Sequence, residues 1–157
     1  MPIQYNSGDL FANEHAAQAL AHGCNCQGSM GAGIAVGFRE RYPAMYEEYR
    51  RRCKARTREF NPGDVFLWKD ADRPSVFNLA TQENTTRQRA TYDAVEQCLT
   101  TMRRLADAET ITRIAMPRIG AGLGGLEWEK VREIIERVFG DWAGELFVYE
   151  GYPGATG

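Results

Sequence analysis

The chain has 157 residues, 43% of them hydrophobic and 25% charged, a balance that is typical of one globular domain and excludes a disordered chain. Its 19 basic and 21 acidic side chains give a net charge of -2, which excludes a general attraction to nucleic acid or to an anionic membrane. No apolar run reaches the ~20 residues of a membrane span, and the first residues lack the basic start and apolar core of a signal peptide, so a cytoplasmic location is expected.

Short apolar runs alternate with amphipathic segments along the chain. Strands are expected at 3–6, around 19–24, and at 64–69, 75–81, 110–117 and 145–150. Helices are expected at 34–55, with a break or a second start at Pro43, and at 90–108 and 126–140. This alternation predicts one α/β domain over residues 1–151, with helices covering a mostly parallel or mixed sheet. Residues 152–157 are expected to form a frayed tail.

One segment departs from the balanced charge. The run "RRRCKARTR", residues 50–58, carries Arg or Lys at most positions. It fits the solvated end of a helix, where the helix dipole favours cations. It also fits a surface that meets a charged macromolecule, and the sequence leaves both interpretations open.

The four cysteines are Cys24, Cys26, Cys53 and Cys98, and in a cytosolic setting they are expected to be free thiols. The segment "HGCNC" has a tighter spacing than structural zinc sites, and no second Cys/His pair follows it at the expected distance. No metal site is therefore expected. The residues before it fit a buried strand in which cysteine serves as a small hydrophobic side chain.

Two glycine-rich segments each stand between an expected strand and an expected helix. Glycines let backbone N–H groups approach an oxyanion closely, and the start of a helix adds partial positive charge. Because such sheets bind ligands at the carboxyl ends of their strands, two loops of this kind predict a site that grips a diphosphate from both sides. The glycines are Gly28, Gly31 and Gly33 in "QGSMGAGIA", and Gly120, Gly122, Gly124 and Gly125 in "MPRIGAGLGGLEW".

Other phosphate-binding motifs fit these loops less well. No Gly-Lys-Ser/Thr follows either loop, so neither is the P-loop of a nucleoside triphosphatase. The segment "GAGIAVG" has a loose dinucleotide-binding spacing, but no acidic residue ends a second strand about 20 residues further on. Hydride transfer is therefore a minor alternative, and a plain tight turn remains the alternative for each glycine taken alone.

Four motifs in order along the chain resemble those of macrodomains: "SGDLF", "MGAGIA", "NLAT" and "MPRIGAGLGGLEW". The resemblance covers nearly the whole chain and is to the branch that contains the terminal ADP-ribose protein glycohydrolase and the antitoxin that removes ADP-ribose from DNA. It implies a three-layer α/β/α fold around a mixed sheet, with ADP-ribose in a cleft at the strand ends. The sequence gives no evidence for a cofactor or a metal, and it leaves the oligomeric state open, with a monomer as the default for this fold.

The resemblance assigns parts of the ligand to particular residues. Asp9 and Leu10 are expected against the adenine, and Asn25 near the distal ribose. Thr81 and Gln82, at the end of a middle strand, belong to the same site. The two loops are expected to wrap the diphosphate and the distal ribose with Met30, Gly31, Ala32, Gly33, Ile34 and Ala35, and with Arg118, Ile119, Gly120, Ala121, Gly122, Leu123 and Gly124.

The chain departs from the glycohydrolase at two positions. That family carries a lysine after the threonine of the middle strand, which attacks the anomeric carbon, and an aspartate in the second loop, which assists. Here Gln82 and Gly124 stand at those positions, whereas the DNA-directed branch shares the second glycine but keeps the lysine. Because glutamine cannot form the covalent adduct that an amine forms, that mechanism is excluded for this chain.

Three functions remain open from the sequence. The favoured one is release of ADP-ribose from protein carboxylates without covalent catalysis, with Gln82 and Asn25 positioning the water or the leaving group and Glu83 a distant candidate for general base. The second is a reader that only binds ADP-ribosylated proteins. The third is hydrolysis of an ADP-ribose phosphate metabolite. Nucleic acid is expected as a partner only where it carries ADP-ribose.

Overall fold

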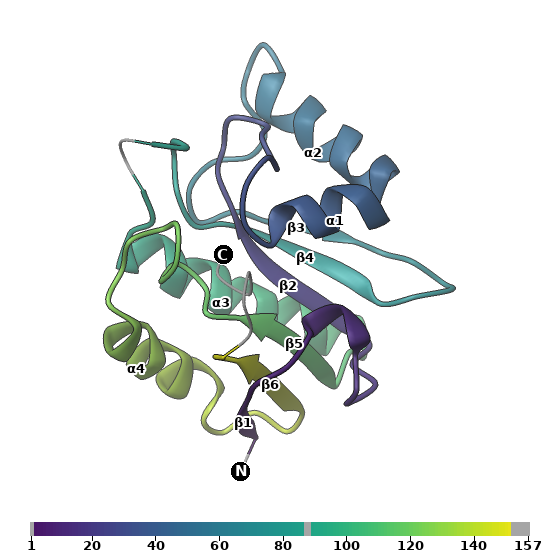
Figure 1. Cartoon of the computed structure of the whole chain (residues 1–157), viewed down its shortest axis with the longest axis vertical. Helices are drawn as coiled ribbons and strands as arrows, with labels where there is room; N and C mark the ends of the chain where they lie inside the picture. The colour runs from purple at the N-terminus through teal and green to yellow at the C-terminus, as the bar shows by residue number, and fades with distance from the viewer. Residues whose placement is uncertain (1, 87–88, 152–157) are drawn as a thin grey trace.

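A computed structural model gives the structure of the chain and describes residues 2–86 and 89–151. The described residues form a six-stranded sheet between two helical layers, which is the α/β/α arrangement expected from the sequence (Figure 1). The expected tail, residues 152–157, lies outside the described residues. The strands are β1 (Ile3–Asn6), β2 (Ala19–Cys24), β3 (Val65–Trp68), β4 (Ser75–Ala80), β5 (Arg113–Pro117) and β6 (Glu145–Tyr149). The helices are α1 (Ala35–Arg41), α2 (Pro43–Lys54), α3 (Tyr92–Ala108) and α4 (Trp128–Phe139), with a short 3-10 turn η1 (Leu10–Ala12).

The strand order is β1-β6-β5-β2-β4-β3. Every neighbouring pair is parallel except the last, in which the edge strand β3 runs antiparallel to β4, so the sheet is mixed, as predicted. The carboxyl ends of β2, β4, β5 and β6 therefore lie at one edge of the sheet. Loops that leave this edge come from distant parts of the sequence and meet in space.

Side chains along each central strand alternate between two apolar layers. In β2, Ala19 and Ala21 pack in the layer of α3 and α4, whereas Leu20 packs in the layer of α1 and α2. In β5, Ile114 faces the first layer and Ala115 the second. Because both faces of these strands are covered, their sequences read as continuous apolar runs, and both helical layers hold the carboxyl edge in place.

The helical break expected at Pro43 is confirmed. α1 ends just before this residue and Pro43 begins α2, where its missing N–H costs no helical hydrogen bond and its fixed φ suits the first turn. Phe38 of α1 and Met45 and Tyr49 of α2 are fully buried against the sheet. Within residues 2–86 and 89–151, no helix is both long and apolar enough to cross a bilayer.

Candidate functional site: a cleft between two glycine loops

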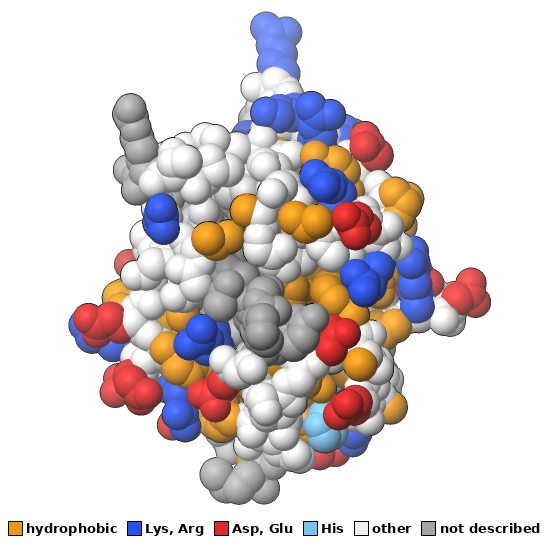
Figure 2. Space-filling model, in the orientation of Figure 1, with side chains coloured by type: hydrophobic (Ala, Val, Ile, Leu, Met, Phe, Trp, Pro, Cys, Tyr) orange, Lys and Arg blue, Asp and Glu red, His pale blue; other side chains and the backbone are white. Residues whose placement is uncertain are grey.

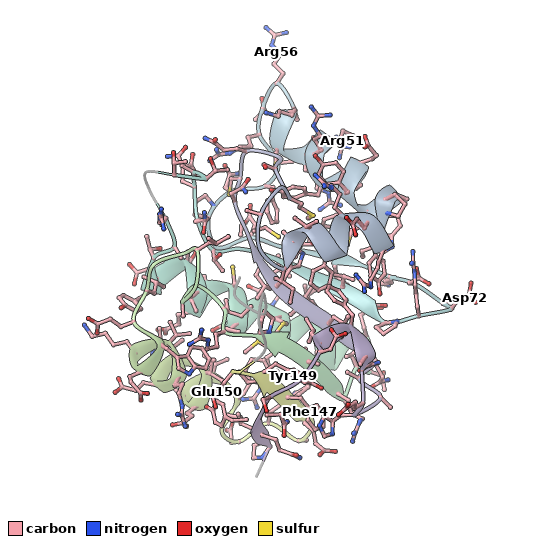
Figure 3. The ribbon with its side chains drawn as sticks, viewed as in Figure 1. Arg51, Arg56, Asp72, Phe147, Tyr149 and Glu150 are labelled. Carbon is pink, nitrogen blue, oxygen red and sulfur yellow. The ribbon has the colours of Figure 1, made fainter. Side chains whose placement is uncertain are left out.

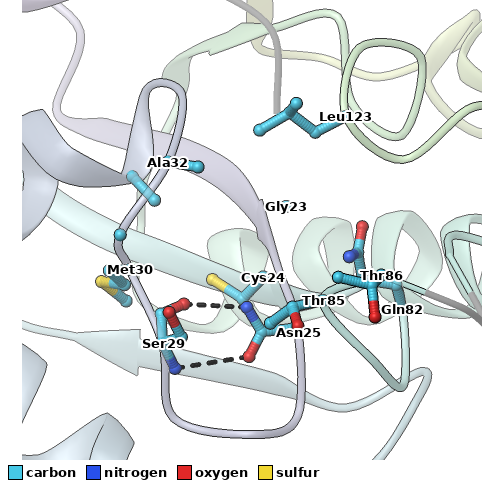
Figure 4. A pocket seen from close by; sticks show the side chains of 12 residues that line it. Gly23, Cys24, Asn25, Ser29, Met30, Ala32, Gln82, Thr85, Thr86 and Leu123 are labelled. Atoms are coloured by element: carbon cyan, nitrogen blue, oxygen red, sulfur yellow. Dashed lines mark hydrogen bonds between the residues drawn. The ribbon is translucent and has the colours of Figure 1, made fainter.

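Two loops leave the carboxyl edge of the sheet from neighbouring strands. The first, residues 25–34, connects β2 to α1, and the second, residues 118–127, connects β5 to α4. Because β2 and β5 pair directly, the loops emerge beside each other and border a cleft of about 330 Å³ (Figure 4). The predicted residues that line this cleft are Asn25, Met30, Gly31, Ala32, Ala35, Gln82 and Leu123.

The Asn25 side chain organises the first loop. Its Oδ1 accepts from the N–H of Gln27 at 2.9 Å. Its Nδ2 donates to the carbonyl of Ser29 at 2.8 Å (Figure 4). The Tyr49 hydroxyl of α2 lies 2.9 Å from the same Oδ1 and 2.8 Å from the Asn25 carbonyl oxygen. Most of the hydrogen-bonding capacity of Asn25 is thus used within the protein, where it fixes the loop that forms one wall of the cleft.

Backbone N–H groups make the first loop a candidate anion site. Among the described residues, no protein acceptor lies on the N–H groups of Gly31, Ala32 and Gly33. All three residues are exposed, and Gly33 has a φ of 61°, which glycine adopts without strain. Successive N–H groups without protein partners favour a negatively charged oxygen, such as one of a diphosphate.

Close backbone packing shapes the second loop instead. Gly120 has a φ of 74°, and its carbonyl accepts from the N–H of Leu126 at 2.9 Å. A Cβ at Gly124 would lie 2.5 Å from the Gly120 carbonyl oxygen and 2.9 Å from the Cβ of Ala90. This backbone therefore has no room for an aspartate at position 124. Leu123, 47% exposed, forms a wall of the cleft opposite the first loop.

The remaining predicted residues lie behind or beside the cleft. Asp9 caps η1, with its Oδ1 accepting from the N–H of Phe11 at 2.9 Å, and Leu10 is fully buried. Thr81 is buried and borders a second cavity of about 460 Å³, which shares Gln82 with the cleft. The other predicted residues that do not line the cleft are Gly33, Ile34, Arg118, Ile119, Gly120, Ala121, Gly122 and Gly124.

Several lining residues were not predicted from the sequence: Gly23, Cys24, Ser29, Thr85 and Thr86. The two threonines had a usable signal, because the polar run "QENTT" directly follows a buried strand and must begin at the carboxyl edge. Gly23 and Cys24 had none, since they belong to an apolar strand whose last residues happen to reach the cleft.

Gln82 and Glu83 follow the end of β4 after Thr81 and have different partners. Gln82 lines the cleft, and its Nε2 donates to the carbonyl of Asn84 at 2.6 Å, while its Oε1 has no hydrogen-bond donor among the described residues. The Glu83 carboxylate accepts two hydrogen bonds from the Arg58 guanidinium, at 2.7 and 2.8 Å, and does not line the cleft. This ion pair holds the Glu83 carboxylate away from the position that a general base needs.

The described lining of the cleft carries no carboxylate, lysine, arginine or histidine. Its ionisable side chain is the Cys24 thiol, and burial raises the pKa of this thiol well above its usual value, so that it stays protonated. The described parts of the chain also contain no group of three His, Cys, Asp or Glu side chains that could hold a metal ion. The cleft therefore offers neutral hydrogen-bonding groups to a ligand.

The family model named Macro domain matches residues 21–135, and the chain belongs to the macrodomain family. It is 33% identical over 140 residues to a DNA ADP-ribosyl glycohydrolase of Mycobacterium tuberculosis, across 87% of this chain but only 38% of the relative. It is 34% identical over 137 residues to the human ADP-ribose glycohydrolase OARD1, across 87% of this chain and 84% of the relative.

A third relative has a different named activity. It is an ADP-ribose 1''-phosphate phosphatase of Meyerozyma guilliermondii, 30% identical over 164 residues, across 86% of this chain and 93% of the relative. Among solved structures, the macrodomain of Thermus aquaticus DarG matches with a TM-score of 0.83 and 28% identity, across 94% of this chain and 97% of that one. This agreement confirms the predicted fold.

Proposed function

We propose that this chain binds ADP-ribose in the cleft and hydrolyses the bond between ADP-ribose and a glutamate or aspartate side chain of a modified protein. One observation carries the proposal. The cleft combines the unpaired N–H groups of the first loop with neutral Gln82, at the position where the resemblance expects a lysine. Two of the relatives are named as a DNA ADP-ribosyl glycohydrolase and an ADP-ribose glycohydrolase, and these names support a ligand of this class.

The bond to be broken is labile, so its hydrolysis does not require a nucleophilic side chain. A carboxylate esterified at the anomeric carbon is a good leaving group, so a correctly held water suffices to attack that carbon. The carbon–oxygen bond to the side chain breaks, the carboxylate leaves with the bonding electrons, and the water oxygen becomes the new hydroxyl. The protein contributes by fixing the sugar and the water, not by forming a covalent intermediate.

Gln82 is the residue best placed to orient this water. Its Nε2 is fixed by the Asn84 carbonyl, which leaves its Oε1 to accept a hydrogen bond from the water. The proton that the water loses passes to a diphosphate oxygen of the substrate and then to solvent, since Glu83 is held by Arg58. Under this proposal the first-loop N–H groups hold the diphosphate in position.

Two alternatives have observations in their favour. The neutral lining fits a reader that binds ADP-ribosylated proteins without cleaving them. The phosphatase relative of Meyerozyma guilliermondii favours hydrolysis of a phosphate from an ADP-ribose phosphate. The two alternatives and the proposal share the ligand and differ in the bond that is broken, so one set of substrates separates them.

The test compares the wild type with two variants on a glutamate-modified protein, alongside calorimetry with ADP-ribose. Gln82→Ala is expected to bind ADP-ribose like the wild type but to release it at least about tenfold more slowly, because the water loses its acceptor. Ala32→Glu puts a carboxylate among the unpaired N–H groups and is expected to weaken ADP-ribose binding at least about tenfold. Position 32 suits this change because Ala32 is exposed and its φ is not positive.

Binding with release that depends on Gln82 supports the proposal. Binding without release indicates the reader, and phosphate release from an ADP-ribose phosphate under the same conditions indicates the phosphatase. Equal ADP-ribose affinity in Ala32→Glu and the wild type contradicts the assignment of the diphosphate to the first loop.

A further inference from the structure

Exposed cations without acidic partners gather where α2 ends. In the segment 50–58, Arg51 forms salt bridges with Glu48 and Glu59, which lie on either side of the segment, and Arg52 forms one with Glu48. The other exposed cations of the segment form no salt bridge among the described residues. These cations, which we call the basic rim, are Arg50, Lys54 and Arg56.

Two residues of the basic rim, Arg50 and Lys54, lie against the first loop of the cleft. A Cβ built on Gly28 would lie 3.3 Å from Cγ of Arg50 and 3.2 Å from Cε of Lys54, so both stems pack against the first loop. Gly28 stands between Asn25 and Ser29, which line the cleft. The long side chains thus rest on the outer side of the loop whose inner side faces the ligand.

The same segment also borders the residues around Gln82. Arg58, two residues after the rim, holds the Glu83 carboxylate, and the Glu83 carbonyl accepts from the N–H of Cys26 at 3.2 Å. Under the proposed function, the bond to be broken lies near Gln82. A protein part that leaves the cleft past the first loop would then pass the end of α2.

Repulsion between charges of the rim destabilises α2. Arg50 and Lys54 are four residues apart on one face of α2, and like charges at this spacing destabilise a helix. The helix dipole offsets part of this repulsion, since both lie near the carboxyl end. Arg and Lys side chains gather at this end of the molecule in Figure 2, and Arg56 extends away from the body in Figure 3. Such a surface attracts a negatively charged partner.

We propose that the basic rim binds acidic side chains next to the modified residue, so that the preferred substrate is an acidic segment of an ADP-ribosylated protein. The inference rests on the proposed function. An acidic peptide fits better than nucleic acid because the rim offers a few separate charges, with Glu47, Glu48 and Glu59 interspersed, and the chain has a net charge of -2. Nucleic-acid-binding domains carry a broad basic face instead.

The experiment uses two peptides that each carry one ADP-ribosylated glutamate, flanked by glutamates in one and by glutamines in the other. The wild type is expected to cleave the acidic peptide with a kcat/KM about tenfold higher at low salt, through a lower KM. The difference should shrink at high salt, because the rim is exposed to solvent. In the variant R50Q/K54Q/R56Q the ratio between the peptides should fall towards one, with the glutamine peptide cleaved as before.

A second triple variant serves as the control. K69Q/R104Q/R137Q removes the same number of charges, one just after β3, one from α3 and one from α4. It should keep the wild-type ratio of kcat/KM between the two peptides. An unchanged ratio in the rim variant, or an equal loss in the control, overturns the proposal. Tighter binding of an ADP-ribosylated oligonucleotide than of the acidic peptide overturns it as well.

The failure of hydrolysis is distinguishable from the failure of the rim. If neither peptide is cleaved, the proposed hydrolysis is wrong, and calorimetry with the same two intact peptides gives the ratio of affinities. A tenfold preference for the acidic peptide that the rim variant loses then supports the rim. Equal affinities contradict it.

Discussion

The two glycine loops reach the same cleft but are held in different ways. The first loop is held by side chains, since Asn25 and the Tyr49 hydroxyl bind its backbone. The second is held by backbone contact, with Gly124 pressed against the Gly120 carbonyl. Gly31 in the first loop thus lines the cleft with room for a Cβ, whereas Gly124 in the second serves the packing of the loop on itself.

The difference also explains why the aspartate that the resemblance to the glycohydrolase implies has no place at position 124. Position 124 is buried and its Cβ direction is blocked by a carbonyl oxygen and by Ala90. A side chain at this position needs a different course of the second loop. The chain therefore has a loop built around glycine, and Gln82 faces the cleft without an acidic neighbour in the described lining.

The largest expected effect of a substitution on stability comes from adding one methyl group to each loop. Gly124→Ala should lower the free energy of unfolding by about 2–3 kcal/mol, because its Cβ would overlap the Gly120 carbonyl oxygen at 2.5 Å. Gly31→Ala should change it by less than about 0.5 kcal/mol, because the nearest heavy atom there is Ser29 Oγ at 3.4 Å. Urea unfolding of both variants measures the difference. Equal losses would contradict the distinction between the loops.

Acid should lower the folding stability through β2, the strand that leads into the first loop. His22 in β2 is fully buried, its Nε2 lies 2.7 Å from the Asn78 Oδ1, and burial lowers its pKa from 6.5 to about 4. Between these values the unfolded chain binds a proton that the folded chain does not. Stability is therefore complete above pH 6.5 and falls as the pH drops towards 4, by about 3 kcal/mol from this group.

Unfolding measured at several pH values between 7 and 4 tests this expectation, with His22→Gln as the comparison. The variant should lose a large part of the pH dependence in this window. The second loop follows β5, which has no buried titratable side chain, so the protection factor of the Leu126 amide against hydrogen exchange should fall less with acid than that of the Gln27 amide. The same pH dependence in the variant would assign the effect to other groups.

A smaller effect is expected from the hydroxyl that anchors the first loop. Tyr49→Phe removes the donor to Asn25 and should lower ADP-ribose affinity roughly fivefold and stability by about 1 kcal/mol. Tyr42→Phe is the matched control, because its hydroxyl donates to the carbonyl of Pro74 at 2.8 Å, outside the cleft lining. It should cost similar stability and leave the affinity unchanged. A fall in affinity for both variants would mean that general loosening, not the loop anchor, is responsible.

Local patterns in the sequence were enough to predict the order of strands and helices. Pro43 marked the start of α2, and the run of apolar residues in β2 marked a strand buried on both faces. The glycine loops were predicted at the correct junctions because strand-to-helix connections in such sheets share one edge.

The roles of single residues depended on contacts that the sequence does not reveal. Asn25 was predicted near the distal ribose and lines the cleft, but its hydrogen bonds to Gln27, Ser29 and Tyr49, the last 24 positions away, could not be predicted. Glu83 looked available as a base until the fold brought Arg58 to it from 25 positions away. Such pairings are set by the packing of α2 on the sheet, and local spacing carries no signal for them.

The smallest expected effect concerns Leu123, which the second loop holds out towards the first. Its side chain is 47% exposed, so Leu123→Ala should change stability by less than about 0.5 kcal/mol. A bound ligand would cover this side chain, and its truncation should weaken ADP-ribose binding a few-fold through lost apolar contact. Calorimetry measures the ADP-ribose affinity of this variant and of Gly31→Ala, which adds a methyl group on the opposite wall of the cleft. An unchanged affinity in Leu123→Ala would mean that the second loop contributes its backbone alone to the ligand.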